Sequence, residues 1–363
     1  MNTLHTIVTT SGELARLATQ LESTQSIGLD TEFLRERTYR AELCLLQLSF
    51  PGDALCVDPL ALADLAPLGR ALTSPGTVKV MHASRQDLEV LLPAVGLVRP
   101  VFDTQIAAAL VGLPAQIGYA DLVRRLLGRD LAKSHTRTDW SRRPLSPEQI
   151  EYAIDDVRYL LPLKSQLEEQ LDKLNRREWL AEELAELGDL AAIVTEPEQA
   201  WLRVKGLRGL DPGRVRLARA LAAWRERRAA ERNRPRGWIL EDGALRDIVV
   251  RLPRSTDALA SIEGLPPNLI KHCGEEILGC VRAAEIPDPA PVVETRQRPD
   301  PAKTALLRHL AALNQSIAGE LGLSPEVLAT RRDLEQLADG RRDVAVLRGW
   351  RRSVMGERML AAL

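Results

Sequence analysis

The chain has 363 residues, of which 45% are apolar, and its formal net charge is −1 at pH 7. This length and composition predict a globular protein of two or three domains. The sequence lacks any run of about 18 uninterrupted apolar residues, and its N-terminus lacks the basic start and apolar stretch of a signal peptide. We therefore expect a soluble, cytoplasmic protein, and these features argue against a membrane-spanning or secreted one.

The four cysteines are widely scattered, at Cys44, Cys56, Cys273 and Cys280, and no two of them form a C-x-x-C pair. Neither a disulfide framework nor a structural zinc site is indicated by this spacing. We expect ordinary thiols of the protein core.

Basic residues are concentrated in one stretch of the chain, in spite of the near-zero total charge. Between Arg203 and Arg236 the sequence contains 11 arginines and one lysine but only three acidic residues. Such an excess favours a polyanionic partner such as a nucleic acid.

The first half of the chain begins with strand patterns and then alternates between helices and strands. Three strands are predicted within residues 26–58, followed by a helix at 60–74 and a short strand at 78–81. A helix at 84–95 and a strand that enters a helix at 101–113 come next. This order predicts an α/β sheet covered by helices.

The next helices are marked by their first residues and by their charges. Ser146, Pro147 and Gln149 form a capping-box pattern that opens a helix through residue 161, where Pro162 could introduce a kink. An acid-rich helix at 167–190 then leads out of the first domain.

The second half of the chain is predicted to be helical. Residues 200–282 form one helical domain, residues 283–301 a proline-rich linker, and residues 302–363 a second helical domain. A shift of 89 residues aligns apolar positions of the two domains, for example Ile239 with Leu328, which favours diverged copies of one unit.

Two acids interrupt the first strand, whose sequence around them reads LDTEF. Asp30 and Glu32 stand two residues apart, so both side chains project from the same face of a strand. Two neighbouring carboxylates repel each other unless cations neutralise them, and hard oxygen ligands suit Mg²⁺ or Mn²⁺. The alternative is an ordinary solvated strand end.

Three more side chains are candidates for the same site. Asp87 follows the strand at 78–81, although Ser84 and Asp87 also fit a capping box for the next helix. Tyr152 and Asp156 are spaced i,i+4 and therefore emerge on one face of their helix, where a simple surface pair is the alternative.

The order of these patterns closely resembles ribonuclease D, within the DEDD superfamily of 3′-to-5′ exonucleases, tyrosine subtype. The resemblance rests on LDTEF, LLQL, MHASRQDLEVL, VFDTQIAA, KSHTRTDW and RPLSPEQIEYAIDDVRYLLPL, and on a helical tail like the HRDC domain. It implies a ribonuclease H-like mixed sheet flanked by helices in residues 1–190, followed by two small all-α HRDC-like domains.

The resemblance also implies the site residues. The four metal-binding acids of the family fall on Asp30, Glu32, Asp87 and Asp156, and its water-positioning tyrosine falls on Tyr152. Four such acids can hold two divalent ions, Mg²⁺ or Mn²⁺, about 3.5–4 Å apart, which activate water and stabilise the leaving oxygen.

Asp155 competes with Asp156 for the fourth acidic position. The residue four before Asp155 is Glu151, which cannot replace the tyrosine, so Asp156 is preferred. Glu151 also stands five residues before Asp156, where the histidine subtype would have its base, and this places the chain with the tyrosine subtype.

Several other residues are candidates for substrate contact or for structure. His82, Lys133 and Arg137 are candidates for RNA contact, with a structural histidine and a solvated basic loop as the alternatives. Asp103 is predicted to cap a helix, Trp140 is predicted to pack in the core, and Gln47 needs hydrogen-bond partners if it is buried.

The resemblance implies a 3′-to-5′ exoribonuclease that releases nucleoside 5′-monophosphates, and we expect the protein to be a monomer. The resemblance implies tRNA precursors and other structured RNAs as substrates, with the arginine-rich domain binding phosphates. The alternatives are a DNA exonuclease of the same superfamily and an RNA-binding protein whose nuclease domain is inactive. The complete set of acids argues against the inactive protein.

Overall fold

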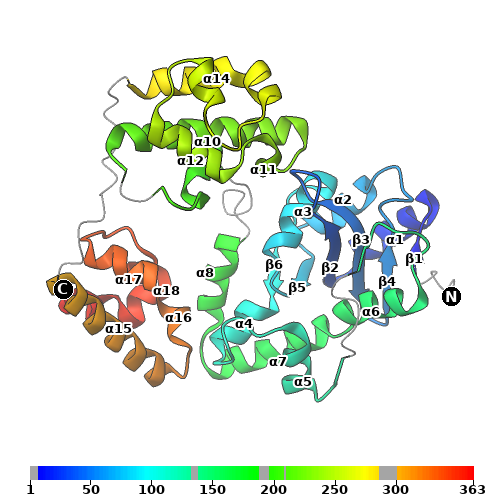
Figure 1. Ribbon diagram of the computed structural model, residues 1–363. Helices are drawn as coiled ribbons and strands as arrows, with labels where there is room; N and C mark the ends of the chain where they lie inside the picture. The colour runs from blue at the N-terminus through cyan, green and yellow to red at the C-terminus, as the bar shows by residue number, and fades with distance from the viewer. Residues whose placement is uncertain (1–6, 132–137, 188–195, 208–209, 286–300) are drawn as a thin grey trace. The chain divides into compact units, whose positions relative to one another are not determined.

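The computed structural model describes residues 7–131, 138–187, 196–207, 210–285 and 301–363. The chain divides into two compact units (Figure 1). Unit 1 comprises Met1–Leu34, Leu43–Ile193 and Asp300–Leu363, and unit 2 comprises Arg35–Glu42 and Val194–Pro299.

Unit 1 is built on a six-stranded mixed sheet with the order β1-β4-β3-β2-β5-β6. Its strands are β1 (Ile7–Val8), β2 (Ser26–Leu34), β3 (Glu42–Phe50), β4 (Asp53–Val57), β5 (Val78–Met81) and β6 (Val101–Asp103). Strands β2, β5 and β6 are parallel neighbours, β1 is parallel to β4, and β3 runs antiparallel to β4. The predicted α/β sheet is confirmed, and β2 lies in its interior.

Helices cover both faces of this sheet. The helices of the first half are α1 (Ser11–Glu22), α2 (Ala66–Thr73), α3 (Arg85–Val95), α4 (Thr104–Leu110), α5 (Tyr119–Leu127), α6 (Pro147–Arg158), α7 (Leu160–Lys173) and α8 (Arg177–Leu187). Ile27 and Leu29 of β2 share a buried cluster with side chains of α1, α2 and α3. Gly28, which points the other way, lies against Val157 and Leu160 of α6 and α7. Successive side chains of β2 point to opposite faces of the sheet, so one face packs against α1, α2 and α3 and the other against α6 and α7.

The helix that carries Tyr152 and Asp156 begins as predicted. The Ser146 hydroxyl accepts from the Gln149 N–H, and the Gln149 side chain accepts from the Ser146 N–H. The predicted single helix at 167–190 is wrong. Helix α7 ends at Lys173 and α8 begins at Arg177, because Asn175 between them adopts the left-handed conformation with φ 54°.

The C-terminal helices of unit 1 share a core with the helices that flank the sheet. They are α15 (Pro301–Leu321), α16 (Pro325–Leu328), α17 (Arg331–Ala338), η2 (Ala345–Leu347), α18 (Gly349–Arg351), η3 (Arg352–Gly356) and α19 (Glu357–Ala361). Leu310 and Leu337 belong to the same buried cluster as Leu163 and Leu180. The rings of Trp179 and Trp350 stack with their centroids 4.4 Å apart. The boundary of a second HRDC-like domain at residue 302 stays a prediction, but its helices do not pack in isolation.

Unit 2 is a helical body with its own core. Its elements are η1 (Pro197–Arg203), α10 (Pro212–Arg232), α11 (Arg236–Ile239), α12 (Asp242–Arg251), α13 (Thr256–Ala260) and α14 (Pro267–Glu285). Leu217 and Leu221 of α10 join Leu245 of α12 and Ile277 of α14 in one buried cluster. The Tyr39 hydroxyl donates to the Glu226 carboxylate at 2.6 Å within this unit.

The cysteines and the helices agree with the class of protein expected. Cys44, Cys56 and Cys273 are buried free thiols, as predicted, and Cys280 is a partly buried free thiol. Among the helices that the structure describes, none combines the length and the apolar character that a bilayer crossing requires.

Candidate active site

Four acidic side chains come from three elements, and three of them lie close enough to influence the ionisation of the fourth, Asp30. Asp30 and Glu32 come from β2, Asp87 from the first turn of α3, and Asp156 from the third turn of α6. Burial, together with the nearby charges of Asp156 and Asp87, raises the pKa of Glu32 to about 8. Both burial and neighbouring negative charges disfavour the charged form of a carboxyl group.

The other acids of the group show the same effect. Burial raises the pKa of Asp30 well above its ordinary value, and the charges of Asp87, Asp156 and Glu32 add to the shift. Burial also raises the pKa of Asp156 to about 7, against the effect of a hydrogen bond that Tyr152 donates to it. These carboxyl groups are therefore harder to ionise than exposed ones, and a bound cation would reverse this effect.

Asp87 is held in place by a hydrogen bond from Thr31 of β2 and not by a capping box. Burial raises its pKa to about 6, although the Thr31 hydroxyl donates to its carboxylate at 2.5 Å and lowers the pKa. The capping box predicted for Ser84 and Asp87 is wrong, because the Ser84 side chain makes no capping hydrogen bond to α3. The Ser84 hydroxyl donates to Asp103 instead, at 2.9 Å.

Asp103 caps α4, as the sequence predicts. Its carboxylate accepts from the backbone N–H groups of Gln105 and Ile106 at 2.8 and 3.3 Å. It also accepts from the Ser84 N–H, at 2.8 Å. Asp103 therefore joins the start of α4 to the turn that precedes α3, and so helps to place Asp87.

Tyr152 lies beside the acids and packs against Trp140. The two rings are stacked with centroids 6.1 Å apart, and Trp140 is buried, which confirms its predicted role in packing. Burial and the charges of Asp156, Glu32 and Asp30 raise the pKa of Tyr152 above its ordinary value. The phenol therefore stays protonated near neutral pH and can donate a hydrogen bond.

Gly28 and Ser49 allow α6 to lie close to the sheet. A Cβ atom on Gly28 would overlap the Ser49 Oγ atom and would lie 3.2 Å from the Val157 carbonyl oxygen. The Ser49 hydroxyl donates to that same carbonyl at 2.7 Å. The distance between β2 and α6, and hence between Asp30 and Asp156, depends on this close contact.

His82 has partners in the protein at both ring nitrogens. Nδ1 lies 2.8 Å from the Thr104 hydroxyl, and Nε2 lies 3.0 Å from the Ile117 carbonyl oxygen. Burial lowers the pKa of His82, which favours the neutral ring, and the Ile117 carbonyl oxygen can only accept, so the ring proton lies on Nε2. These contacts favour the structural role that the sequence left open, and contact with RNA stays a prediction.

Gln47 is fully buried on β3, and among the described residues neither its amide nitrogen nor its amide oxygen has a hydrogen-bond partner. Its side chain projects from the same face of β3 as Ser49, two residues along, which is the face that meets α6. Its partner on β4 is Cys56, whose pKa is raised by burial and by the charge of Asp156.

Tyr119 is a residue of this region that sequence reasoning missed. Its hydroxyl donates to the Asp155 carbonyl at 3.1 Å and accepts from the Tyr159 N–H at 3.1 Å. Burial, opposed in part by the hydrogen bond from Tyr159, raises its pKa, and the charges of Asp156 and Asp30 contribute. A single tyrosine at the start of a helix has no spacing pattern that would have identified it. Lys133 and Arg137 lie outside the described residues.

The donor set suits divalent cations, although it would have to adjust to hold them. Carboxylate oxygens are the preferred ligands of Mg²⁺ and Mn²⁺, and positive ions would balance the charge shared by the four acids. As they stand, no three histidine, cysteine, aspartate or glutamate side chains in the described ranges are arranged to hold a metal ion. The acids would therefore have to turn toward the ions on binding.

Comparison with known proteins identifies a domain in each half of the chain. A family model described as 3′-5′ exonuclease matches residues 5–172, and an HRDC domain model matches residues 215–281. Ribonuclease D of Gluconacetobacter diazotrophicus is 40% identical to the chain, over 98% of this chain and 92% of that protein. The chain belongs to the ribonuclease D family. Ribonuclease D of Granulibacter bethesdensis is 38% identical, with the same coverage of 98% and 92%.

The fold of the whole chain agrees with the family as well. The crystal structure of Escherichia coli RNase D superposes with a TM-score of 0.87 at 30% identity, covering 100% of this chain and 99% of that one. That protein is described as an exoribonuclease involved in structured RNA processing. Membership of the ribonuclease D family makes this chain a 3′-to-5′ exoribonuclease with an exonuclease domain followed by a helical HRDC region.

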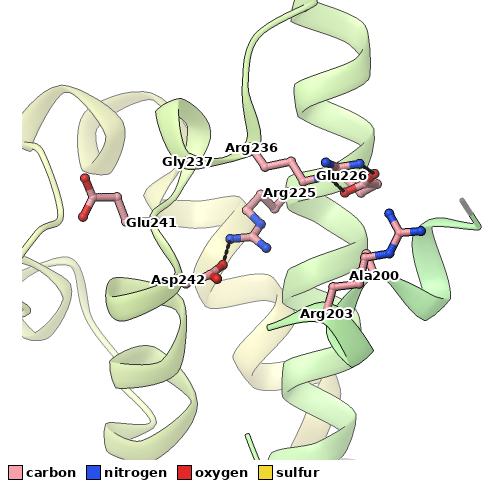
Figure 2. Close-up of a pocket in the computed structure, with 8 residues that line it drawn as sticks. All are labelled: Ala200, Arg203, Arg225, Glu226, Arg236, Gly237, Glu241 and Asp242. Atoms are coloured by element: carbon pink, nitrogen blue, oxygen red, sulfur yellow. Dashed lines mark hydrogen bonds and ion pairs between the residues drawn. The ribbon is translucent and has the colours of Figure 1, made fainter. Parts of the chain in front are cut away.

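Many of the arginines concentrated between Arg203 and Arg236 form ion pairs with acids of the HRDC region. Arg225 pairs with Asp242 at 2.7 Å, and Arg236 pairs with Glu226 at 2.6 Å. Both pairs line a pocket of about 470 Å³ and are drawn as dashed contacts in Figure 2. Three more of these arginines pair with acids: Arg214 with Asp211, Arg227 with Glu198, and Arg228 with Glu276. At least five of the 11 arginines are therefore engaged within the protein, and fewer remain to contact phosphates.

Proposed function

We propose that this ribonuclease D removes nucleotides one at a time from the 3′ end of RNA, using two divalent cations held by Asp30, Glu32, Asp87 and Asp156. The observation that carries the proposal is the electrostatic coupling of these acids. Each of Asp30 and Glu32 has its pKa raised by burial and by neighbouring carboxylates of the group. A buried cluster of acids is costly to the fold unless cations or protons neutralise it.

The protein's own groups have distinct roles in the proposed reaction. The cations, when bound, would polarise the phosphodiester and lower the pKa of the attacking water. Tyr152 stays protonated and donates to Asp156, so it would orient the water by hydrogen bonding instead of removing its proton. Trp140, stacked on Tyr152, holds the phenol ring in position.

The proposed substrates are tRNA precursors and other structured RNAs with single-stranded 3′ ends. Residues 200–282 contain 17 basic and 10 acidic residues, so this region favours a polyanion even after its internal ion pairs are formed. The description of the Escherichia coli relative as an enzyme of structured RNA processing supports the same substrate class.

The experiment that tests the proposed function incubates the purified protein with a 3′-extended tRNA transcript, with Mg²⁺ and with EDTA. We expect release of nucleoside 5′-monophosphates in Mg²⁺ only, identified by mass spectrometry, and loss of release in Asp30→Asn. A DNA strand of the same sequence, tested in parallel, decides between an RNA and a DNA exonuclease. Release that persists in EDTA, or internal cleavage, would contradict the proposed function.

A further inference from the structure

Trp238 is exposed to an extent unusual for its residue type. It is 60% exposed, the largest value among the large apolar side chains that the structure describes, while the other five tryptophans are buried or partly buried. One exposed apolar side chain is common on protein surfaces and has no meaning by itself. Two further features of unit 2 distinguish Trp238.

The first feature is that Trp238 is held by an anchored turn. Its backbone N–H donates to the Pro235 carbonyl at 2.9 Å, and the next two residues, Ile239 and Leu240, are buried. The Leu240 carbonyl accepts from the guanidinium of Arg225 at 3.0 Å. The exposed ring is therefore presented from a fixed backbone, and a ligand would lose little binding energy to ordering it.

The second feature is the positive charge beside the ring. The guanidinium of Arg234 lies 5.7 Å from the centroid of the Trp238 ring, within the range of a cation–π contact. Arg232 and Arg234 are exposed, and across the described part of the chain neither forms an ion pair. They differ in this from Arg227 and Arg228 on the preceding turns of α10, which pair with acids.

We propose that Trp238 is a stacking platform for an unpaired base of the bound RNA, with Arg232 and Arg234 contacting the adjacent phosphates. The inference rests on the proposed function, since it assigns a binding site to the same RNA substrate. An aromatic face beside free arginines is suited to a single strand, because bases of any sequence stack on it while cations follow the backbone. The guanidinium groups of Arg232 and Arg234 also make this site a poorer match for an apolar protein surface than for RNA.

The experiment measures RNA affinity in EDTA, so that no hydrolysis occurs. Fluorescence anisotropy compares a labelled 12-nucleotide RNA with an abasic strand that has the same ribose-phosphate backbone. We expect Trp238→Ala to bind the RNA about tenfold more weakly, or ~1.4 kcal/mol, within the range of one stacked base. Its affinity for the abasic strand should equal that of the wild type.

Two further variants separate stacking from a general effect of the substitution. Trp238→Phe keeps an aromatic face and should retain most of the RNA affinity. Leu202→Ala removes another exposed apolar side chain of unit 2, 57% exposed, and should leave RNA affinity within about twofold of the wild type. The wild-type tryptophan fluorescence should be quenched by RNA, and the part contributed by Trp238 should be missing in Trp238→Ala.

Three results would overturn the inference, and they can be told apart from failure of the nuclease proposal. Equal RNA affinity of Trp238→Ala and the wild type would exclude stacking and leave Trp238 as a contact for a protein partner. Equal losses on the RNA and on the abasic strand would indicate a structural effect instead of base stacking. A wild-type protein that neither binds nor hydrolyses RNA would overturn both proposals, whereas normal hydrolysis with an unaffected Trp238→Ala overturns only this one.

Discussion

At the scale of single residues, a variant of Tyr152 can distinguish two functions of the site, the binding of cations and the positioning of the attacking water. We expect Tyr152→Phe to lower kcat about 100-fold or more, within the range usual for a group that positions or transfers a proton. The acids are untouched, so Mg²⁺ should still protect the variant against thermal unfolding. Single-turnover hydrolysis and melting curves with and without Mg²⁺ check these two expectations. Equal rates in Tyr152→Phe and the wild type would remove the phenol from the reaction.

The raised pKa values also predict how stability depends on pH. Folding raises the pKa of Glu32 to about 8 and that of Asp156 to about 7, so the folded protein binds protons more tightly than the unfolded chain. The stabilisation is complete below the ordinary carboxyl pKa and is lost as the pH rises through 7 and 8. Without cations, the free energy of unfolding should therefore fall over this range, and Mg²⁺ should restore it at pH 8.

Urea denaturation at pH 5, 6, 7 and 8 in EDTA measures this dependence, with Glu32→Gln as the control. The variant lacks one of the titrating groups and should lose less stability between pH 5 and pH 8 than the wild type. Identical pH dependence in the two proteins would mean that Glu32 does not carry the shift.

At the scale of elements, the contact between β2 and α6 decides whether the acids can meet. Gly28→Ala places a Cβ against Ser49 Oγ and the Val157 carbonyl, so α6 must move away from the sheet. We expect a loss of about 1–3 kcal/mol of stability from overpacking, and a larger loss of activity than of stability. The control is Gly12→Ala, because a Cβ at Gly12 has nothing within 4 Å. If Gly28→Ala retained full activity, the close contact would not position Asp156.

Sequence patterns predicted the helices and strands that carry the candidate residues, but they did not predict the contacts between those elements. Strand and helix periodicity made Asp30 with Glu32 and Tyr152 with Asp156 candidate pairs, and the resemblance to ribonuclease D joined them into one predicted site. The capping box of α6 was visible at Ser146. The hydrogen bond from Thr31 to Asp87 was not predictable, since it joins residues 56 positions apart. Asn175 was missed in the same way, because an asparagine in an otherwise helical pattern does not by itself announce a left-handed turn.

At the scale of the whole molecule, the C-terminal helices stabilise the body that carries the active site. Trp350 is buried against Trp179, and its indole N–H donates to Glu183 of α8 at 2.7 Å. We expect Trp350→Ala to lower the free energy of unfolding by about 3–5 kcal/mol. Urea denaturation measures the change, and Trp238→Ala is the matched control, since an exposed tryptophan should cost about 0.5 kcal/mol or less. Similar losses in the two variants would contradict the shared core.

The sequence did not predict that the C-terminal helices share a core with the helices that flank the sheet. The proline-rich stretch and the repeat of apolar positions predicted a separate second helical domain, and both are local features of the chain. Leu310 and Leu337 share a cluster with Leu163 and Leu180, which come from much earlier in the sequence. Periodicity shows which face of a helix is apolar, but it does not show which partner covers that face.

The most direct test of the central claim is a crystal of the protein soaked in Mn²⁺, with anomalous scattering used to locate the ions. We expect two Mn²⁺ peaks ligated by the carboxylates of Asp30, Glu32, Asp87 and Asp156, with these side chains turned toward the ions. Peaks elsewhere, or four acids that remain apart with no ion between them, would contradict it.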